Sequence, residues 1–291
     1  ATAAFLQSTQ AADIAATIER EAITHLPCVP TIAMALAELP PDSRAMLRSL
    51  RVITVGGQKL QEPTARKLRS KYPWLIVQQV FGMAEGLICY TRLDDPDDIA
   101  CTTQGRPMSP ADEVRIVDAG GNEVREGEVG ELWCRGPYTI RGYYRAPARN
   151  AEAFTADGFY RTGDLVRRGT GGNLVVEGRV KDLINRGGEK ISAEEIEAHL
   201  LAHPAVMIAA VVPMPDAVLG EKACAYVKLR PGACLDLAAL REHLGARGVA
   251  RFKWPERLEI VAEMPLTNVG KIKKAELRAD IERKLERERS A

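Results

Sequence analysis

The sequence predicts an α/β fold that leads into a β-rich segment, part of a small β-barrel or a curled sheet, and ends in a small α+β domain. Three observations support this prediction. Buried-type strands alternate with helices and stop at glycine turns over residues 1–100. Short alternating strands with Gly-rich turns fill residues 101–180. A capping box opens a series of amphipathic helices and strands over residues 181–291.

The first segment alternates helices with apolar strands, which hydrophobic spacing identifies and Gly or Pro residues bound. In order these are a helix over residues 11–21, a strand over 25–29, a helix from Pro30 to Leu39, a strand over 50–55, a helix over 62–71 and a strand over 75–80. The last two strands end at Gly56-Gly57 and at Phe81-Gly82. Strands of this kind form a parallel sheet, whose ligands bind at the carboxyl ends.

The two later segments have a different texture. Strands over residues 113–118 and 130–134 alternate apolar with polar residues between Gly-rich turns, which is typical of antiparallel sheet. After a boundary near Lys181, Ser192-Ala193-Glu194-Glu195 forms a capping box that opens a helix. The remaining elements are strands over 206–212, 223–229 and 257–261 and helices marked by apolar stripes over 237–244 and 277–285.

Charge and cysteine usage exclude several classes of function. Lys and Arg number 40 and Asp and Glu 39, a net charge of +1, which argues against a nucleic-acid binder held by a global positive field. No apolar run reaches the roughly 20 residues of a membrane span. Six scattered cysteines without a CxxC pair predict reduced thiols in a cytoplasmic protein. His199 and His203 have the spacing of a zinc site but no third ligand, so we interpret them as a helix end before Pro204.

Five short motifs place chemistry-bearing residues along most of the chain. In order they are Val80-Phe81-Gly82-Met83-Ala84-Glu85, Tyr160-Arg161-Thr162-Gly163-Asp164, Gly178-Arg179-Val180-Lys181-Asp182, Arg186-Gly187-Gly188-Glu189-Lys190 and Asn268-Val269-Gly270-Lys271. A single carboxylate such as Asp164 can accept hydrogen bonds from both hydroxyls of a ribose. A loop with two glycines is conformationally permissive, and a loop lysine can offset charge on a phosphate.

This ordered set resembles the adenylate-forming ligases, which include acyl- and aryl-CoA synthetases, luciferase and the adenylation domains of nonribosomal peptide synthesis. The resemblance implies ATP and Mg²⁺ as cofactors, with a substrate carboxylate attacking the α-phosphorus of ATP while pyrophosphate leaves. It implies that Lys271 is the catalytic lysine and that Glu85 holds the metal. The implied nucleotide-binding residues are Gly57, Phe81, Gly82, Asp164 and Arg179. The implied hinge is Lys181, and the loop that turns inward for thiolation is Gly187, Gly188, Glu189 and Lys190.

Within this family the chain is most similar to the aryl-acid ligases of siderophore synthesis, which activate 2,3-dihydroxybenzoate or salicylate. Residues 79–87, 90–96, 135–144 and 185–190 carry this similarity. It implies an aryl pocket formed by Gly56, Val80, Ile88 and Cys89, and as partner the phosphopantetheine thiol of an aryl carrier protein. The dihydroxybenzoate activators tend to have an Asn where this chain has the less polar Cys89, so we favour salicylate, with 2,3-dihydroxybenzoate next.

The family's phosphate loop is not found in these 291 residues. We therefore expect the C-terminal part of a ligase that is inactive alone, with residues 1–180 in the large adenylation domain and 181–291 as the small mobile domain. The alternatives are half of a split enzyme, a degenerate copy, and a non-catalytic fragment that docks a carrier protein or another partner. A fatty acyl-CoA synthetase is a further alternative, which Cys89 and residues 138–144 disfavour.

Overall fold

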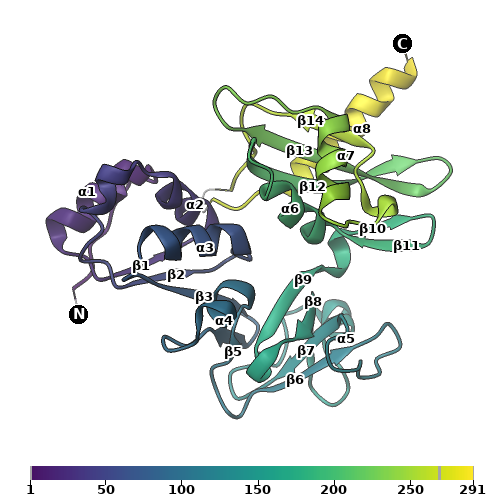
Figure 1. Cartoon of the computed structure of the whole chain (residues 1–291). Coiled ribbons are helices and arrows are strands. Elements are labelled where there is room, and N and C mark those ends of the chain that lie inside the picture. Colours follow the sequence, from purple (N-terminus) through teal and green to yellow (C-terminus); the bar gives the residue numbers. More distant parts are fainter. Residues whose placement is uncertain (1, 268–269, 291) are drawn as a thin grey trace. The chain divides into compact units, whose positions relative to one another are not determined.

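The chain divides into two compact units, residues 1–176 and residues 177–291. The structure is a computed structural model and describes residues 2–267 and 270–290 (Figure 1). Within these ranges, none of the helices combines the length and the apolar character that crossing a membrane requires.

The first unit begins with a five-stranded sheet flanked by helices. Its strands, in spatial and chain order, are β1 (His25–Cys28), β2 (Val52–Val55), β3 (Ile76–Met83), β4 (Leu87–Tyr90) and β5 (Arg106–Pro107). Its helices are α1 (Ala11–Glu21), α2 (Pro30–Glu38), α3 (Glu62–Lys71) and α4 (Asp97–Thr102), with a 3₁₀ turn at Pro41–Arg44. The first three strands pair in parallel, which confirms the predicted sheet, and β4 and β5 continue it antiparallel.

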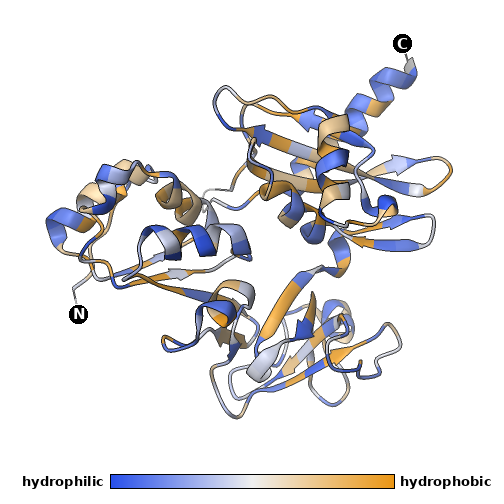
Figure 2. Cartoon of the chain, in the orientation of Figure 1, coloured by the Kyte–Doolittle hydropathy of each residue, from blue (hydrophilic) through white to orange (hydrophobic). Residues whose placement is uncertain are grey.

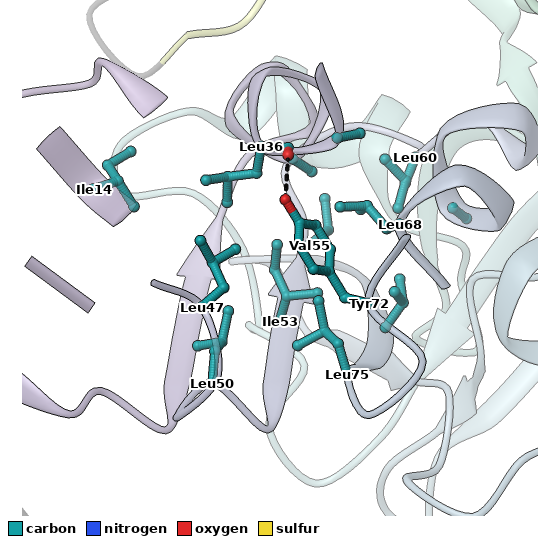
Figure 3. Packing of buried hydrophobic residues seen from close by; sticks show 14 of the residues in the cluster. Ile14, Leu36, Leu47, Leu50, Ile53, Val55, Leu60, Leu68, Tyr72 and Leu75 are labelled. Carbon is teal, nitrogen blue, oxygen red and sulfur yellow. Dashed lines mark hydrogen bonds between the residues drawn. The ribbon is translucent and has the colours of Figure 1, made fainter. Parts of the chain in front are cut away.

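A buried apolar cluster holds the first three helices against this sheet. Leu36 and Leu68 come from α2 and α3, Ile53 comes from β2, and all three are fully buried. Tyr72 fills the centre, and its hydroxyl donates a hydrogen bond to the backbone carbonyl of Leu36 at 3.0 Å (Figure 3). Each such apolar side chain contributes about 1.5–3 kcal/mol when it leaves water, so this cluster fixes the strands that carry the candidate site.

The second sheet of this unit is open. Its strands are, in order, β6 (Glu113–Val117), β7 (Gly130–Arg135), β8 (Tyr160–Arg168) and β9 (Leu174–Arg179), with α5 (Pro147–Ala153) and a 3₁₀ turn at Thr170–Gly172. The expected antiparallel sheet therefore forms, but its described strands do not close into a barrel. Closure needs the two edge strands to pair, and here β6 pairs with β7 and not with β9.

Two buried glutamine side chains join the two sheets of this unit. Gln104 Nε2 donates to Gln79 Oε1 of β3 at 3.1 Å, and Gln104 Oε1 accepts from the backbone N–H of Val176 at 2.8 Å. Gln79 Nε2 donates to the carbonyl of Ala100 at 2.9 Å. Because buried amides are costly when unpaired, this chain of bonds sets the position of β9 relative to β3.

The second unit is a sheet with helices on both faces. Its strands are β10 (Leu183–Arg186), β11 (Glu189–Ser192), β12 (Val206–Asp216), β13 (Gly220–Leu229) and β14 (Arg257–Ile260). Its helices are α6 (Ala193–Leu201), α7 (Leu237–Ala246) and α8 (Lys274–Ser290), with 3₁₀ turns at Val180–Asp182 and Arg251–Lys253. Ser192 caps α6 by accepting from the N–H of Glu195, as the capping box predicts.

The helices of this unit are sorted by the alternation of β12. Val211 faces the cluster that includes Ile196 of α6, whereas Val212 faces the cluster that includes Leu277 of α8. Successive residues of a strand point to opposite faces, so α6 and α8 cover opposite sides of the sheet. Figure 2 shows the corresponding pattern, with largely hydrophobic strands β12 and β13 and a mostly hydrophilic end of α8.

Candidate active site

Glu85 lies in the tight connection between β3 and β4. The two strands form a hairpin in which Phe81 pairs with Cys89 and Met83 with Leu87. The backbone carbonyl of Glu85 accepts from the N–H of Ile140 at 2.9 Å, which ties the connection to the segment after β7.

A tyrosine pair holds the Glu85 side chain. The hydroxyl of Tyr143 donates to Glu85 Oε1 at 2.9 Å, and the hydroxyls of Tyr143 and Tyr160 are 3.1 Å apart. Burial, followed by the bond to Tyr143 and the charge of Glu85, raises the pKa of Tyr160, so the Tyr160 phenol stays protonated. The carboxylate is therefore held in one orientation.

Asp164 owes its position to an irregularity in β8. The register between β7 and β8 shifts between Glu131 and Trp133, so that residues 162–164 bulge opposite Leu132. Thr162 Oγ1 donates to the carbonyl of Leu132 at 2.8 Å and accepts from the N–H of Asp164 at 3.0 Å. A bulge redirects the side chains that follow it, and Asp164 is only 4% exposed.

Glu85 and Asp164 converge on one buried thiol. Burial, followed by the negative charges of Asp112, Asp164 and Glu85, raises the pKa of Cys134 to about 12. Cys134 also pairs with Tyr160 of β8, the strand that contains Asp164, and the Tyr160 hydroxyl lies 3.1 Å from that of Tyr143, which donates to Glu85. The structure thus brings together two predicted site residues that are far apart in the sequence.

Phe81 packs against the apolar cluster that contains Cys134. Its ring is partly buried, and the same cluster contains Cys89 and Tyr160. Gly82, the next residue, is exposed and pairs with Ile88 across the hairpin.

The predicted aryl residues Gly56 and Val80 are in close contact. A Cβ at Gly56 would lie 2.3 Å from Val80 Cγ1, so only glycine lets the end of β2 approach β3 this closely. The next residue, Gly57, has a φ of 86°, and the chain turns away from the sheet there.

Ile88 and Cys89 point to opposite faces of β4. Ile88 is 38% exposed and shares a face with Val80 and Gly82, whereas Cys89 is fully buried on the face of Phe81. Burial raises the pKa of Cys89 to about 12. The thiol of Cys89 is thus part of the core and not of the face that Val80 and Ile88 share.

The second unit holds the predicted hinge. Lys181 is exposed at the centre of a 3₁₀ turn, and Arg179 is exposed just before it. The neighbouring Asp182 forms an ion pair with Arg278 of α8, which also donates to the carbonyl of Lys181.

The predicted thiolation loop is the turn of the β10–β11 hairpin. Gly187 and Gly188 have φ values of 59° and 95°, in the region that favours glycine. The N–H of Gly187 donates to the carbonyl of Leu219 at 2.8 Å, and Glu189 and Lys190 are exposed on the following strand.

Lys271 lies at the end of a second hairpin loop. Leu266 and Ile272 form a bridge, and the backbone of Lys271 both donates to Thr267 Oγ1 at 3.0 Å and accepts from the N–H of Thr267 at 2.7 Å. Asn268 and Val269, the first residues of this motif, lie outside the described residues.

Few side chains of the described residues are arranged to hold a metal ion. In residues 2–267 and 270–290, no three His, Cys, Asp or Glu side chains are grouped so that they could hold an ion. Glu85 alone still suits Mg²⁺, which is usually bound by one or two carboxylates together with substrate phosphates. His203 instead stacks edge-on against His243, with ring centroids 4.8 Å apart, just beyond the end of α6.

Tyr143 was not among the site residues predicted from the sequence. This residue belongs to the segment Arg141-Gly142-Tyr143-Tyr144, in which a tyrosine pair is a visible signal, but nothing in the segment indicates contact with Glu85.

Comparisons with known proteins bear on the family and the fold. The model of the AMP-binding enzyme family matches residues 1–144, and that of the AMP-binding enzyme C-terminal domain matches residues 195–271. The amide bond synthetase McbA from Marinactinospora thermotolerans is similar in structure, with a TM-score of 0.84, 33% identity, and coverage of 94% of this chain and 55% of that chain.

Three curated relatives are similar over more than nine tenths of this chain. Pyochelin synthase PchD of Pseudomonas aeruginosa is 56% identical over 93% of this chain and 49% of its own length. The 2,3-dihydroxybenzoate-AMP ligase of Bacillus subtilis is 52% identical over 92% and 49%. The salicyl-AMP ligase / salicyl-S-ArCP synthetase of Mycobacterium tuberculosis is 48% identical over 94% and 48%. The chain spans about half the length of the curated relatives it matches.

The folds of the two units are those of adenylate-forming enzyme domains. The chain belongs to the AMP-binding enzyme family, with the fold of its C-terminal domain in the second unit.

Proposed function

We propose that the polypeptide carrying this chain uses ATP to activate an aryl carboxylic acid and passes the acyl group to the phosphopantetheine thiol of an aryl carrier protein, in siderophore synthesis. The link from Glu85 through Tyr143 to Tyr160 of β8, the strand that also contains Asp164, carries this proposal. In this proposal Glu85 is the metal-binding carboxylate and Asp164 the ribose-binding one. The names of two relatives, a 2,3-dihydroxybenzoate-AMP ligase and a salicyl-AMP ligase, support an aryl acid as substrate.

In the first half-reaction the acid attacks the α-phosphorus of ATP and pyrophosphate leaves. Asp164 accepts hydrogen bonds from the ribose hydroxyls, and Phe81 packs on adenine. The nucleotide also contacts Gly57, Gly82 and Arg179. Lys271 offsets the negative charge that develops on the α-phosphate and the attacking carboxylate. Two hydrogen bonds between Lys271 and Thr267 hold the lysine backbone for this role.

Glu85 would hold Mg²⁺, with Tyr143 keeping its carboxylate in one orientation. When bound, the ion neutralises phosphate charge.

In the second half-reaction a thiol attacks the acyl adenylate and AMP leaves. We assign Lys181 as the hinge between the two half-reactions and Gly187, Gly188, Glu189 and Lys190 as the loop that meets the thiol arm. Exposure of Lys181 and the positive φ values of both glycines suit these roles. The name of one relative, a salicyl-S-ArCP synthetase, supports a carrier protein as acceptor.

Salicylate is the preferred acid in this proposal. Val80, Gly82 and Ile88, with Gly56 against Val80, form an apolar part of one face of the β3–β4 hairpin, and Tyr90, which pairs with Val80, lies on the same face. A second ring hydroxyl buried against Gly82 and Ile88 would lose its hydrogen bonds to water, which costs about 1–3 kcal/mol. The preference therefore depends on Ile88 and not on the buried thiol of Cys89.

Pyrophosphate exchange tests the function. We would assay salicylate, 2,3-dihydroxybenzoate and benzoate with this chain and with the same chain extended upstream. Exchange that is lost in Lys271→Ala and kept in Lys273→Ala supports an aryl-acid ligase. No exchange by the extended polypeptide with any acid would instead favour a non-catalytic docking fragment.

Substrate preference has its own test. Ile88→Asn should raise the rate with 2,3-dihydroxybenzoate relative to salicylate, whereas Cys89→Ser should leave the ratio unchanged. A clear preference of the unsubstituted polypeptide for 2,3-dihydroxybenzoate would refute salicylate as its acid.

A further inference from the structure

A buried ion pair joins α6 to α8 in the second unit. Glu197 Oε1 lies 2.8 Å from Lys274 Nζ, and the two side chains are only 10% and 16% exposed. The same carboxylate oxygen accepts the backbone N–H of Val211 at 2.6 Å. Val211 belongs to β12, which is an edge strand of the sheet formed by the described residues. Glu197 therefore also satisfies a backbone N–H at the edge of the sheet.

Further charged groups surround this pair. Burial by itself would lower the pKa of Lys274, but the carboxylates of Glu197, Glu194 and Asp182 raise it, and the net shift is upward. Asp182 in turn forms an ion pair with Arg278, one turn further along α8. We call these five residues the ion cluster.

Apolar packing alone does not fix α6 relative to α8. The two helices lie on opposite faces of the sheet and contribute to different apolar clusters. A buried ion pair adds little stability over an apolar pair of the same size, but it has one satisfactory geometry. The Glu197–Lys274 pair thus supplies a directional link around the edge of β12.

This link reaches the predicted catalytic loop directly. Lys274 is the first residue of α8, three residues after Lys271. Between them, the N–H of Lys273 donates to the carbonyl of Pro265 at 2.9 Å, which closes the hairpin that presents Lys271. Whatever holds Lys274 therefore holds the end of that hairpin.

We propose that Glu197 and Lys274 are positioning residues for Lys271: their ion pair fixes the start of α8, and with it the lysine hairpin, relative to the sheet and to the turn at Lys181. The catalytic role of Lys271 rests on the proposed function, whereas the anchoring of the hairpin does not.

The variants are chosen to separate positioning from stability. Lys274→Met leaves the Glu197 carboxylate buried without its cation, so it should also lower the thermal midpoint. The double variant Glu197→Gln/Lys274→Met removes both charges but keeps a side-chain acceptor for Val211, so it should recover most of that midpoint. Lys273→Met is the matched control, because within the described residues Lys273 pairs with the exposed Glu276.

Amide hydrogen exchange of the 291-residue chain measures how firmly the lysine hairpin is held, and it requires no enzymatic activity. The amides of Lys271 and Lys273, which are bonded within the hairpin, should exchange at least about tenfold faster in Lys274→Met and in the double variant, but not in Lys273→Met. Exchange equal to that of the unsubstituted chain in both variants would overturn the proposal.

Activity assays of the extended polypeptide measure how displacement of the lysine hairpin affects each half-reaction. Pyrophosphate exchange should fall at least about tenfold in both variants, since a displacement of about 1 Å can cost roughly 100-fold. Thioester formation from a supplied acyl adenylate should stay within about twofold, because that step does not use Lys271. If the double variant regains both its thermal midpoint and its rate of pyrophosphate exchange, the ion pair has a structural role only. Failure of the unsubstituted polypeptide to catalyse exchange would count against the proposed function, and amide exchange would still decide the anchoring.

Discussion

Replacing Tyr143 by Phe should raise the Mg²⁺ requirement of adenylation. The substitution removes only the hydroxyl that donates to Glu85 Oε1 at 2.9 Å and contacts Tyr160 at 3.1 Å. A hydrogen bond to a charged group contributes about 1.5–3 kcal/mol. Independently, loss of a group that orients a metal ligand typically costs about 10- to 100-fold in metal affinity or activity. The two magnitudes agree, because tenfold corresponds to about 1.4 kcal/mol.

The assay is pyrophosphate exchange by the extended polypeptide as a function of Mg²⁺ concentration. We expect the half-saturating concentration to rise about tenfold in Tyr143→Phe. The neighbouring Tyr144 is 84% exposed, so Tyr144→Phe is the matched control and should behave as the unsubstituted protein. The same Mg²⁺ dependence in both variants would refute the role of Tyr143 in holding Glu85.

Three further predictions concern packing and the burial of thiols. The side chain introduced by Gly56→Val would overlap with Val80, since a Cβ alone would lie 2.3 Å from Val80 Cγ1. Denaturant unfolding should show that the free energy of unfolding falls by about 1–3 kcal/mol and is partly recovered by Val80→Ala. An unchanged unfolding midpoint would contradict the contact. Cys234 is exposed, so a thiol reagent at pH 8 should modify it far faster than Cys89 or Cys134, and equal rates would show that these two are not buried. Burial raises the pKa of Cys89 and of Cys134 from 9.0 to about 12, so the stability that these thiols contribute is complete below pH 9 and is lost as the pH rises toward 12. Cys134→Ala should therefore flatten the decline of unfolding free energy above pH 9, and an unaltered slope would exclude this thiol as a cause.

Periodic elements were predictable because a local pattern defines them. The helices α1 and α3 begin and end where apolar spacing and flanking residues predict, at Ala11–Glu21 and Glu62–Lys71. The strand β3 instead runs to Met83, three residues beyond the predicted end at Val80, because Phe81 and Gly82 pair with β4 rather than form a turn. Glycine in a strand is tolerated here since the partner backbone approaches it closely.

Site residues were predictable as types but not as contacts. Motif order predicted Glu85 and Asp164 as site residues, whereas the position of Asp164 depends on a bulge in β8 that no local pattern indicates. Tyr143 is 58 residues from Glu85 in the chain, so only the folded β3–β4 hairpin brings them together. Pairing over such separations is decided by tertiary packing and not by propensity.

The alternation of β4 gives two neighbouring residues different freedom to vary. Position 89 is enclosed by core side chains, so a change of volume there is penalised whatever the substrate. Position 88 is half open on the other face, where a change of size alters what can lie against it and leaves the core intact. In a gene copy that evolves to use a new acid, substitutions would therefore accumulate at position 88 before position 89. A mutant library aimed at new substrates should randomise position 88 and keep position 89 constant.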